Sequence, residues 1–165
     1  MIDNLQEAEK QFAAHVPNSE AVFIVLKAHL VIEMRLIEFI KARISPELYK
    51  EVSSSSECSF HVRLFLARAL SERDEIPTED AHILWPALRR LGNLRNDVAH
   101  LLEHKGTSLD DKMRAFVEAV DPLGKVFGKA TSAKELHGTF RIAANYLNSL
   151  LAIDCEPLFA ADEQP

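Results

Sequence analysis

Residues 20–43 read EAVFIVLKAHLVIEMRLIEFIKAR and form the most apolar part of the chain. Around residues 22–26 this segment is hydrophobic on nearly every side of a helix, which indicates burial on several sides. The pattern predicts a long helix that lies at the centre of a helical bundle or partly in a dimer interface.

Two polar side chains interrupt the apolar pattern of this segment. With about 100° of rotation per residue, His29 and Glu33 fall one turn apart on a stripe that also contains Leu26 and Leu36. A buried carboxylate without a partner is costly or takes up a proton. We therefore expect Glu33 to pair with a basic side chain from another helix.

Helical periodicity continues through the rest of the chain. It predicts further helices over residues 3–14, 46–52, 60–70, 79–103, 109–120 and 132–154. Ser19 is expected to cap the helix over residues 20–43, and Ser59 and Ser108 are expected to cap two of the others. The expected fold is all-α, an up-and-down helical bundle of about five main helices plus short ones. Residues 1–157 are expected to form one domain, followed by a disordered acidic tail over residues 158–165.

Composition and charge narrow the classes of function. The chain has 165 residues, 47% of them hydrophobic, and a formal net charge of -6. Such a chain does not attract nucleic acid or membranes as a whole, although arginines cluster locally near residue 90. Cys58 and Cys155 lie too far apart for a metal site, so reduced thiols in a cytoplasmic protein are expected. Neither a secretion signal nor a membrane span is expected.

The strongest functional signal is residues 94–100, LRNDVAH, near the end of a long predicted helix. Arg95 falls on the apolar stripe of that helix and is the basic partner that we expect for Glu33. His100 falls on nearly the opposite side, in line with Asn96.

Residues 91–100, LGNLRNDVAH, resemble the R-x4-H signature of the HEPN superfamily, in which a polar residue, here Asn96, typically follows the arginine. The order of helices over roughly residues 19–120 is also similar. Mannitol operon repressor-like proteins are similar in helical plan but depart at the motif. The resemblance implies an α-helical bundle that dimerises with its two motifs facing each other. Active members are metal-independent ribonucleases, often toxins or antiphage effectors, whereas other members are non-catalytic.

The resemblance also implies roles for the motif residues. His100 would act as general acid or base on the RNA 2′-hydroxyl or the leaving oxygen. Arg95 would hold the scissile phosphate and its developing charge, and Asn96 would orient the pair. No metal or other cofactor is expected, because the 2′-hydroxyl is an internal nucleophile. The expected supporting residues are Glu33 and His29. Four arginines would either bind along an RNA backbone or form a solvated helix face: Arg63, Arg68, Arg89 and Arg90.

We therefore expect a cytoplasmic, homodimeric endoribonuclease of the HEPN type, a toxin or phage-defence effector. RNA and a cognate antitoxin or regulatory protein are its expected partners. The alternative is a non-catalytic HEPN-like regulatory or protein-interaction module. In that case Arg95 pairs with Glu33 in the core and His100 is a surface or capping residue.

Three further patterns are interpreted as structural rather than functional. Residues 100–104, HLLEH, match the inverted zinc-protease pattern H-x-x-E-H. That class needs a third ligand on a downstream helix within a larger mixed fold, for which only Glu118 or Glu135 are obvious candidates, and Gly106 places the pattern in the last turn of the predicted helix. Cys58-x-x-His61 is half of a metal site. Trp85 beside Pro86 is more typical of packing than of a base-stacking platform.

Overall fold

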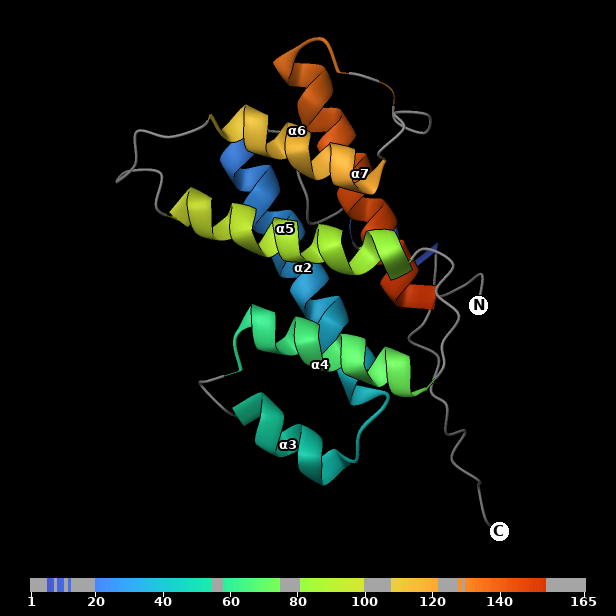
Figure 1. Cartoon of the computed structure of the whole chain (residues 1–165). Helices are drawn as coiled ribbons and strands as arrows, with labels where there is room; N and C mark the ends of the chain where they lie inside the picture. The colour runs from blue at the N-terminus through green and yellow to red at the C-terminus, as the bar shows by residue number, and fades with distance from the viewer. Residues whose placement is uncertain are drawn as a thin grey trace.

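The computed structural model of the chain describes residues 6–7, 9–10, 12, 20–54, 58–74, 81–99, 108–121, 128 and 130–153. In this part of the chain all regular structure is helical, which confirms the all-α helical bundle (Figure 1). The helices within these ranges are α2 (Ala21–Lys41), α3 (Pro46–Ser54), α4 (Phe60–Arg73), α5 (Ala81–Ala99), α6 (Leu109–Val120) and α7 (Ala133–Ile153).

The predicted central helix is α2. It packs against α7, α4 and α5 and also touches α3. Its buried residues lie on several sides, as the apolar pattern predicts, and they include Ile24, Val25 and Ile32. Figure 1 shows α4 and α5 crossing in front of α2, with α7 beside it and α6 packed next to α5. The site described below lies where α2, α4 and α5 meet.

Two of the three predicted serine caps are present; the N-cap of α2 is instead Glu20, without a side-chain capping bond, and Ser19 lies outside the described residues. The Ser59 hydroxyl accepts a hydrogen bond from the Val62 amide at 3.4 Å, and the Ser108 hydroxyl accepts one from the Asp111 amide at 3.2 Å. These bonds satisfy amides that have no partner within the first turn of a helix.

Two helices extend beyond their predicted ends. α3 continues to Ser54 and takes in the first serines of a predicted loop. α4 continues to Arg73, whose guanidinium bonds Asp74 at 2.6 Å and the Arg43 carbonyl at 3.2 Å. Contacts with the end of α2 therefore stabilise a last turn of α4 that its own apolar pattern does not predict.

α4 and α5 run antiparallel, so the start of α4 lies beside the last third of α5 (Figure 1). Gly92 makes this approach close. A Cβ at that position would lie 2.8 Å from two ring carbons of Phe60 and 3.2 Å from the His61 ring. The absence of a side chain at Gly92 thus allows the first residues of α4 to pack against the segment of α5 that contains Arg95 and Asn96.

Several predictions concern residues outside the described part of the chain. Most of the predicted helix over residues 3–14 lies there, although Phe12 is described and buried. The end of the predicted motif helix and the tail over residues 158–165 lie there too. Among the described helices, none combines the length and apolar character needed to cross a membrane.

Candidate functional site

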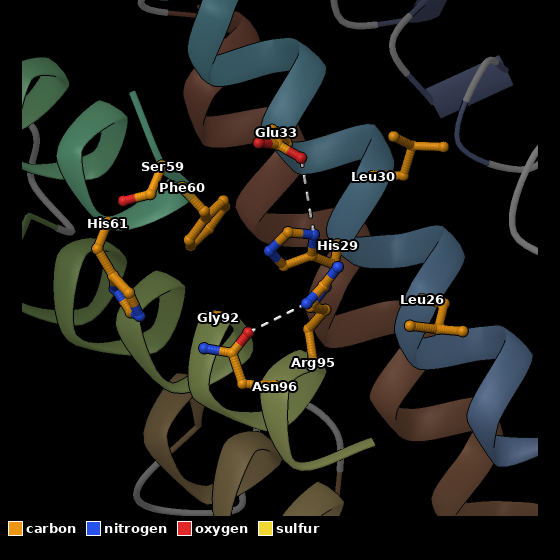
Figure 2. Close-up of a pocket in the computed structure, with 10 residues that line it drawn as sticks. All are labelled: Leu26, His29, Leu30, Glu33, Ser59, Phe60, His61, Gly92, Arg95 and Asn96. Atoms are coloured by element: carbon orange, nitrogen blue, oxygen red, sulfur yellow. Dashed lines mark hydrogen bonds and ion pairs between the residues drawn. The ribbon is translucent and has the colours of Figure 1, made fainter. Parts of the chain in front are cut away.

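A pocket of about 430 Å³ opens between α2, the start of α4 and the end of α5. It brings together side chains from three segments that are far apart in the sequence (Figure 2). Its lining residues are Leu26, His29, Leu30, Glu33, Ser59, Phe60, His61, Gly92, Arg95 and Asn96. Four predicted site residues, Arg95, Asn96, His29 and Glu33, therefore share one cavity.

Arg95 is exposed, and its guanidinium donates a hydrogen bond to the Asn96 side-chain oxygen at 3.3 Å. It pairs with no acidic side chain among the described residues. In Figure 2 the Arg95 side chain extends from α5 toward the His29 ring. The positive charge of Arg95 thus remains available at the pocket.

The predicted pairing of Glu33 with Arg95 is wrong. The Glu33 carboxylate forms a salt bridge with Arg63 of α4. Both side chains are about one-fifth exposed, at 22% and 21%. The periodicity of α5 put Arg95 on the correct side of its helix, but it could not give which arginine lies opposite Glu33. That choice depends on how α4 crosses α2.

His29 lies at the back of the pocket and is 7% exposed. Its ring packs on Phe60, with the ring centroids 4.3 Å apart. Burial, with smaller contributions from the positive charge of Arg95 and from the neighbouring His61, lowers the pKa of His29 from 6.5 to about 4. His29 is therefore neutral at pH 7, and its 3.9 Å contact with Glu33 joins a carboxylate to an uncharged imidazole.

His61 is a pocket residue that the sequence analysis did not assign to the site. It follows Phe60 at the start of α4, and its ring meets the Phe60 ring edge-on with centroids 5.9 Å apart. His61 lies next to the motif helix because α4 and α5 approach each other closely at Gly92, which is a tertiary contact. The sequence signals were the Ser59 cap, which fixes where α4 begins, and the glycine within the motif helix.

The remaining predicted site residues either fall outside the described residues or line a different cavity. His100 lies outside the described residues, as does the HLLEH segment. Arg89 and Arg90 are exposed on α5 and line a neighbouring groove. Within the described part of the chain, no three histidine, cysteine or acidic side chains gather as a metal site would require.

The chemistry of the pocket is compatible with an anion. It presents the Arg95 guanidinium, the Asn96 amide and two imidazoles, and the charge of Glu33 is balanced by Arg63. A guanidinium matches the oxygens of a phosphate in a bidentate way. An anion beside His29 would also favour its protonated form, because it opposes the charge of Arg95.

Comparison of this chain with protein-family models, with curated proteins and with solved structures found no match.

Proposed function

We propose that this protein is a metal-independent endoribonuclease of the HEPN type. The observation that carries the proposal is the Arg95–Asn96 pair, which faces a pocket with no unbalanced carboxylate among its lining residues. An arginine that served the core would be paired and buried, as Arg63 and Arg43 are largely buried against acidic partners. Arg95 is neither.

The proposed reaction uses the 2′-hydroxyl of RNA as its nucleophile. Arg95 holds the scissile phosphate through its non-bridging oxygens and stabilises the charge that develops on them. His100 takes the proton of the 2′-hydroxyl, or gives one to the leaving oxygen. The 2′ oxygen bonds to phosphorus as the bond to the 5′ oxygen breaks. The products are a 2′,3′-cyclic phosphate and a 5′-hydroxyl end.

The residues around Arg95 have positioning roles in this proposal. Asn96 accepts a hydrogen bond from Arg95 and limits the orientations of the guanidinium. The salt bridge to Arg63 keeps the Glu33 carboxylate from binding Arg95 in place of a phosphate. His29 in its neutral form adds a hydrogen-bonding group without adding charge.

The biological setting that we propose is a cytoplasmic toxin or phage-defence effector that acts as a homodimer and is controlled by a cognate antitoxin or regulatory protein. An apolar stripe on α2 supports the dimer. Phe23, Leu30 and Met34 are 53%, 48% and 57% exposed, and Leu30 also lines the pocket. A second copy on this stripe would lie at the pocket.

The same stripe supports a second candidate, a non-catalytic interaction module. Exposed apolar side chains on one helix face are typical of binding surfaces for other proteins. In this case α2 binds a partner and the Arg95 pocket binds an anion without cleaving it. The version of this alternative in which Arg95 pairs with Glu33 is excluded by the Arg63 salt bridge.

The test is cleavage of several RNAs in EDTA by the wild-type protein. We expect cyclic-phosphate products from the wild type. Because Arg95→Lys keeps the charge but loses the bidentate geometry, it should lower the rate markedly. Arg95→Ala and His100→Ala should lower it roughly 100-fold or more. Lys134→Ala, which removes a charge from the exposed start of α7, is the matched control. Intact RNA with folded wild-type protein would reject the proposal.

A further inference from the structure

A second cavity, of about 680 Å³, lies along the antiparallel pair of α4 and α5. α4 contributes Phe65 and Arg68 to it, and α5 contributes Trp85, Arg89 and Arg90. His61 lines this groove and also the Arg95 pocket. The two cavities therefore meet at His61, and the groove runs from the pocket along the helix pair.

The charge of the groove is opposite to that of the whole chain. The chain carries a net charge of -6, yet three arginines and no acidic residue line the groove. Arg89 and Arg90 are exposed and pair with no acid among the described residues. Arg68 bonds Glu72 at 2.8 Å, but both side chains are more than half exposed, so this bond is weak and easily exchanged for a phosphate.

An exposed aromatic ring lies among these arginines. Phe65 is 74% exposed, the largest value among the exposed large hydrophobic residues of the described ranges, and it lines the groove. Trp85, at 8% exposed, is buried and packs edge-on against Phe39, so it belongs to the floor. Exposure of the Phe65 ring to water is unfavourable for the free energy of folding. A phenyl ring beside three guanidinium groups is, however, suited to binding a ligand that contains planar bases and phosphates.

We propose that this groove binds the single-stranded RNA that flanks the scissile phosphate. Arg68, Arg89 and Arg90 contact successive phosphates, and one unpaired base stacks on Phe65. A duplex is disfavoured, because its bases are already stacked on both faces. That the bound strand is a substrate rests on the proposed nuclease function, whereas the binding itself is measured without cleavage.

The test is binding of a fluorescein-labelled single-stranded oligouridine to the full chain carrying His100→Ala, measured by fluorescence anisotropy over a range of KCl concentrations. Phe65→Ala should weaken binding about tenfold and leave the salt dependence unchanged. Arg90→Gln should also weaken binding, and it should reduce the slope of log K against log salt by roughly 0.7. The matched controls are Ile142→Ala and Lys134→Gln, which alter an exposed apolar residue and a charge on α7.

Groove variants that bind like their matched controls would overturn the inference. So would equal binding of a duplex, or equal binding of a polyglutamate peptide, since the groove would then be a general surface for anions. Different results would reject the nuclease proposal and the groove inference. If binding depends on Phe65 and Arg90 but the wild type cleaves no RNA, the groove inference stands. If the wild type cleaves RNA and the groove variants have unchanged KM, the nuclease stands and the groove inference fails.

Discussion

His29 is buried in surroundings that disfavour its charged form. The groups that face it are Glu33 on its own helix, His61 on α4 and Arg95 on α5. Burial has the largest effect on its pKa, and the two basic neighbours act in the same direction. At neutral pH His29 therefore adds no second positive charge beside Arg95.

The depressed pKa of His29 predicts how stability changes with pH. The pKa falls from 6.5 to about 4 on folding, so between these values the unfolded chain binds a proton that the folded protein does not. The free energy of unfolding should therefore rise from pH 4 to pH 6.5, by on the order of 3 kcal/mol from this residue, and level off above. Urea denaturation at a series of pH values measures it.

Two variants isolate the contribution of His29 to this pH dependence. His29→Gln should flatten the rise, because the side chain no longer titrates. His82→Asn, at an exposed position of α5, should keep the rise and serves as the control. An identical pH profile for His29→Gln and the wild type would show that His29 is not the group responsible.

The partner of Glu33 is testable by double-mutant cycles. Because Glu33 and Arg63 form a partly buried salt bridge, Glu33→Gln and Arg63→Gln should show a coupling free energy of about 1 kcal/mol. Glu33→Gln and Arg95→Gln should be additive within about 0.5 kcal/mol. Chemical denaturation of the single and double variants gives both values. Stronger coupling to Arg95 than to Arg63 would contradict the observed pairing.

At the scale of elements, the contact between α4 and α5 joins the Arg95 pocket to the groove lined by Phe65 and Arg90. Ser59 caps the first turn of α4, Phe60 packs on His29, and His61 lies at the junction of the two cavities. Gly92 on α5 allows this contact, since any side chain there would meet the Phe60 ring. The packing of two helices thus determines the shape of the site.

Gly92→Ala should therefore destabilise the protein although it adds a good helix former. The gain in helix propensity is about 1 kcal/mol, and the crowding of Phe60 costs about 1–3 kcal/mol. The matched control is Gly138→Ala in α7, where an added Cβ meets nothing within 4 Å and stability should rise. Thermal unfolding of both variants measures these changes in stability. Equal stabilisation by the two substitutions would refute close packing at Gly92.

At the scale of the whole molecule, the apolar stripe of α2 predicts self-association. Phe23, Leu30 and Met34 recur at positions that share one helix face, and their exposure is costly in water. Within the described part of the chain, α2 packs against α3, α4, α5 and α7, while this stripe stays exposed and its Leu30 lines the pocket.

We expect a wild-type dimer in light scattering coupled to size exclusion, and a monomer for Met34→Glu, because a buried unpaired carboxylate would oppose the contact. Leu48→Glu, at a similarly exposed apolar position of α3, should leave the dimer intact. A wild-type protein that stays monomeric at all concentrations would rule out this interface.

Much of the fold is determined by the local sequence. Apolar periodicity placed α2, α4, α5, α6 and α7 within a few residues of their described bounds, and Ser59 and Ser108 cap helices as expected. Burial of the stripe of α5 also follows from its sequence, with Leu84, Leu88 and Leu91 fully buried. These features depend on rotation about a single helix axis and on hydrogen bonds within the first turn.

The tertiary structure alone decided which of these side chains meet. Glu33 pairs with Arg63, 30 positions along the chain, rather than with Arg95, and that choice leaves the Arg95 guanidinium free of an acidic partner in the described ranges. His61 enters the site, and Phe65 with Arg68 faces Arg89 and Arg90. A helical pattern fixes the direction of a side chain about its own axis. The crossing and register of neighbouring helices, set here by contacts such as the one at Gly92, decide what it touches.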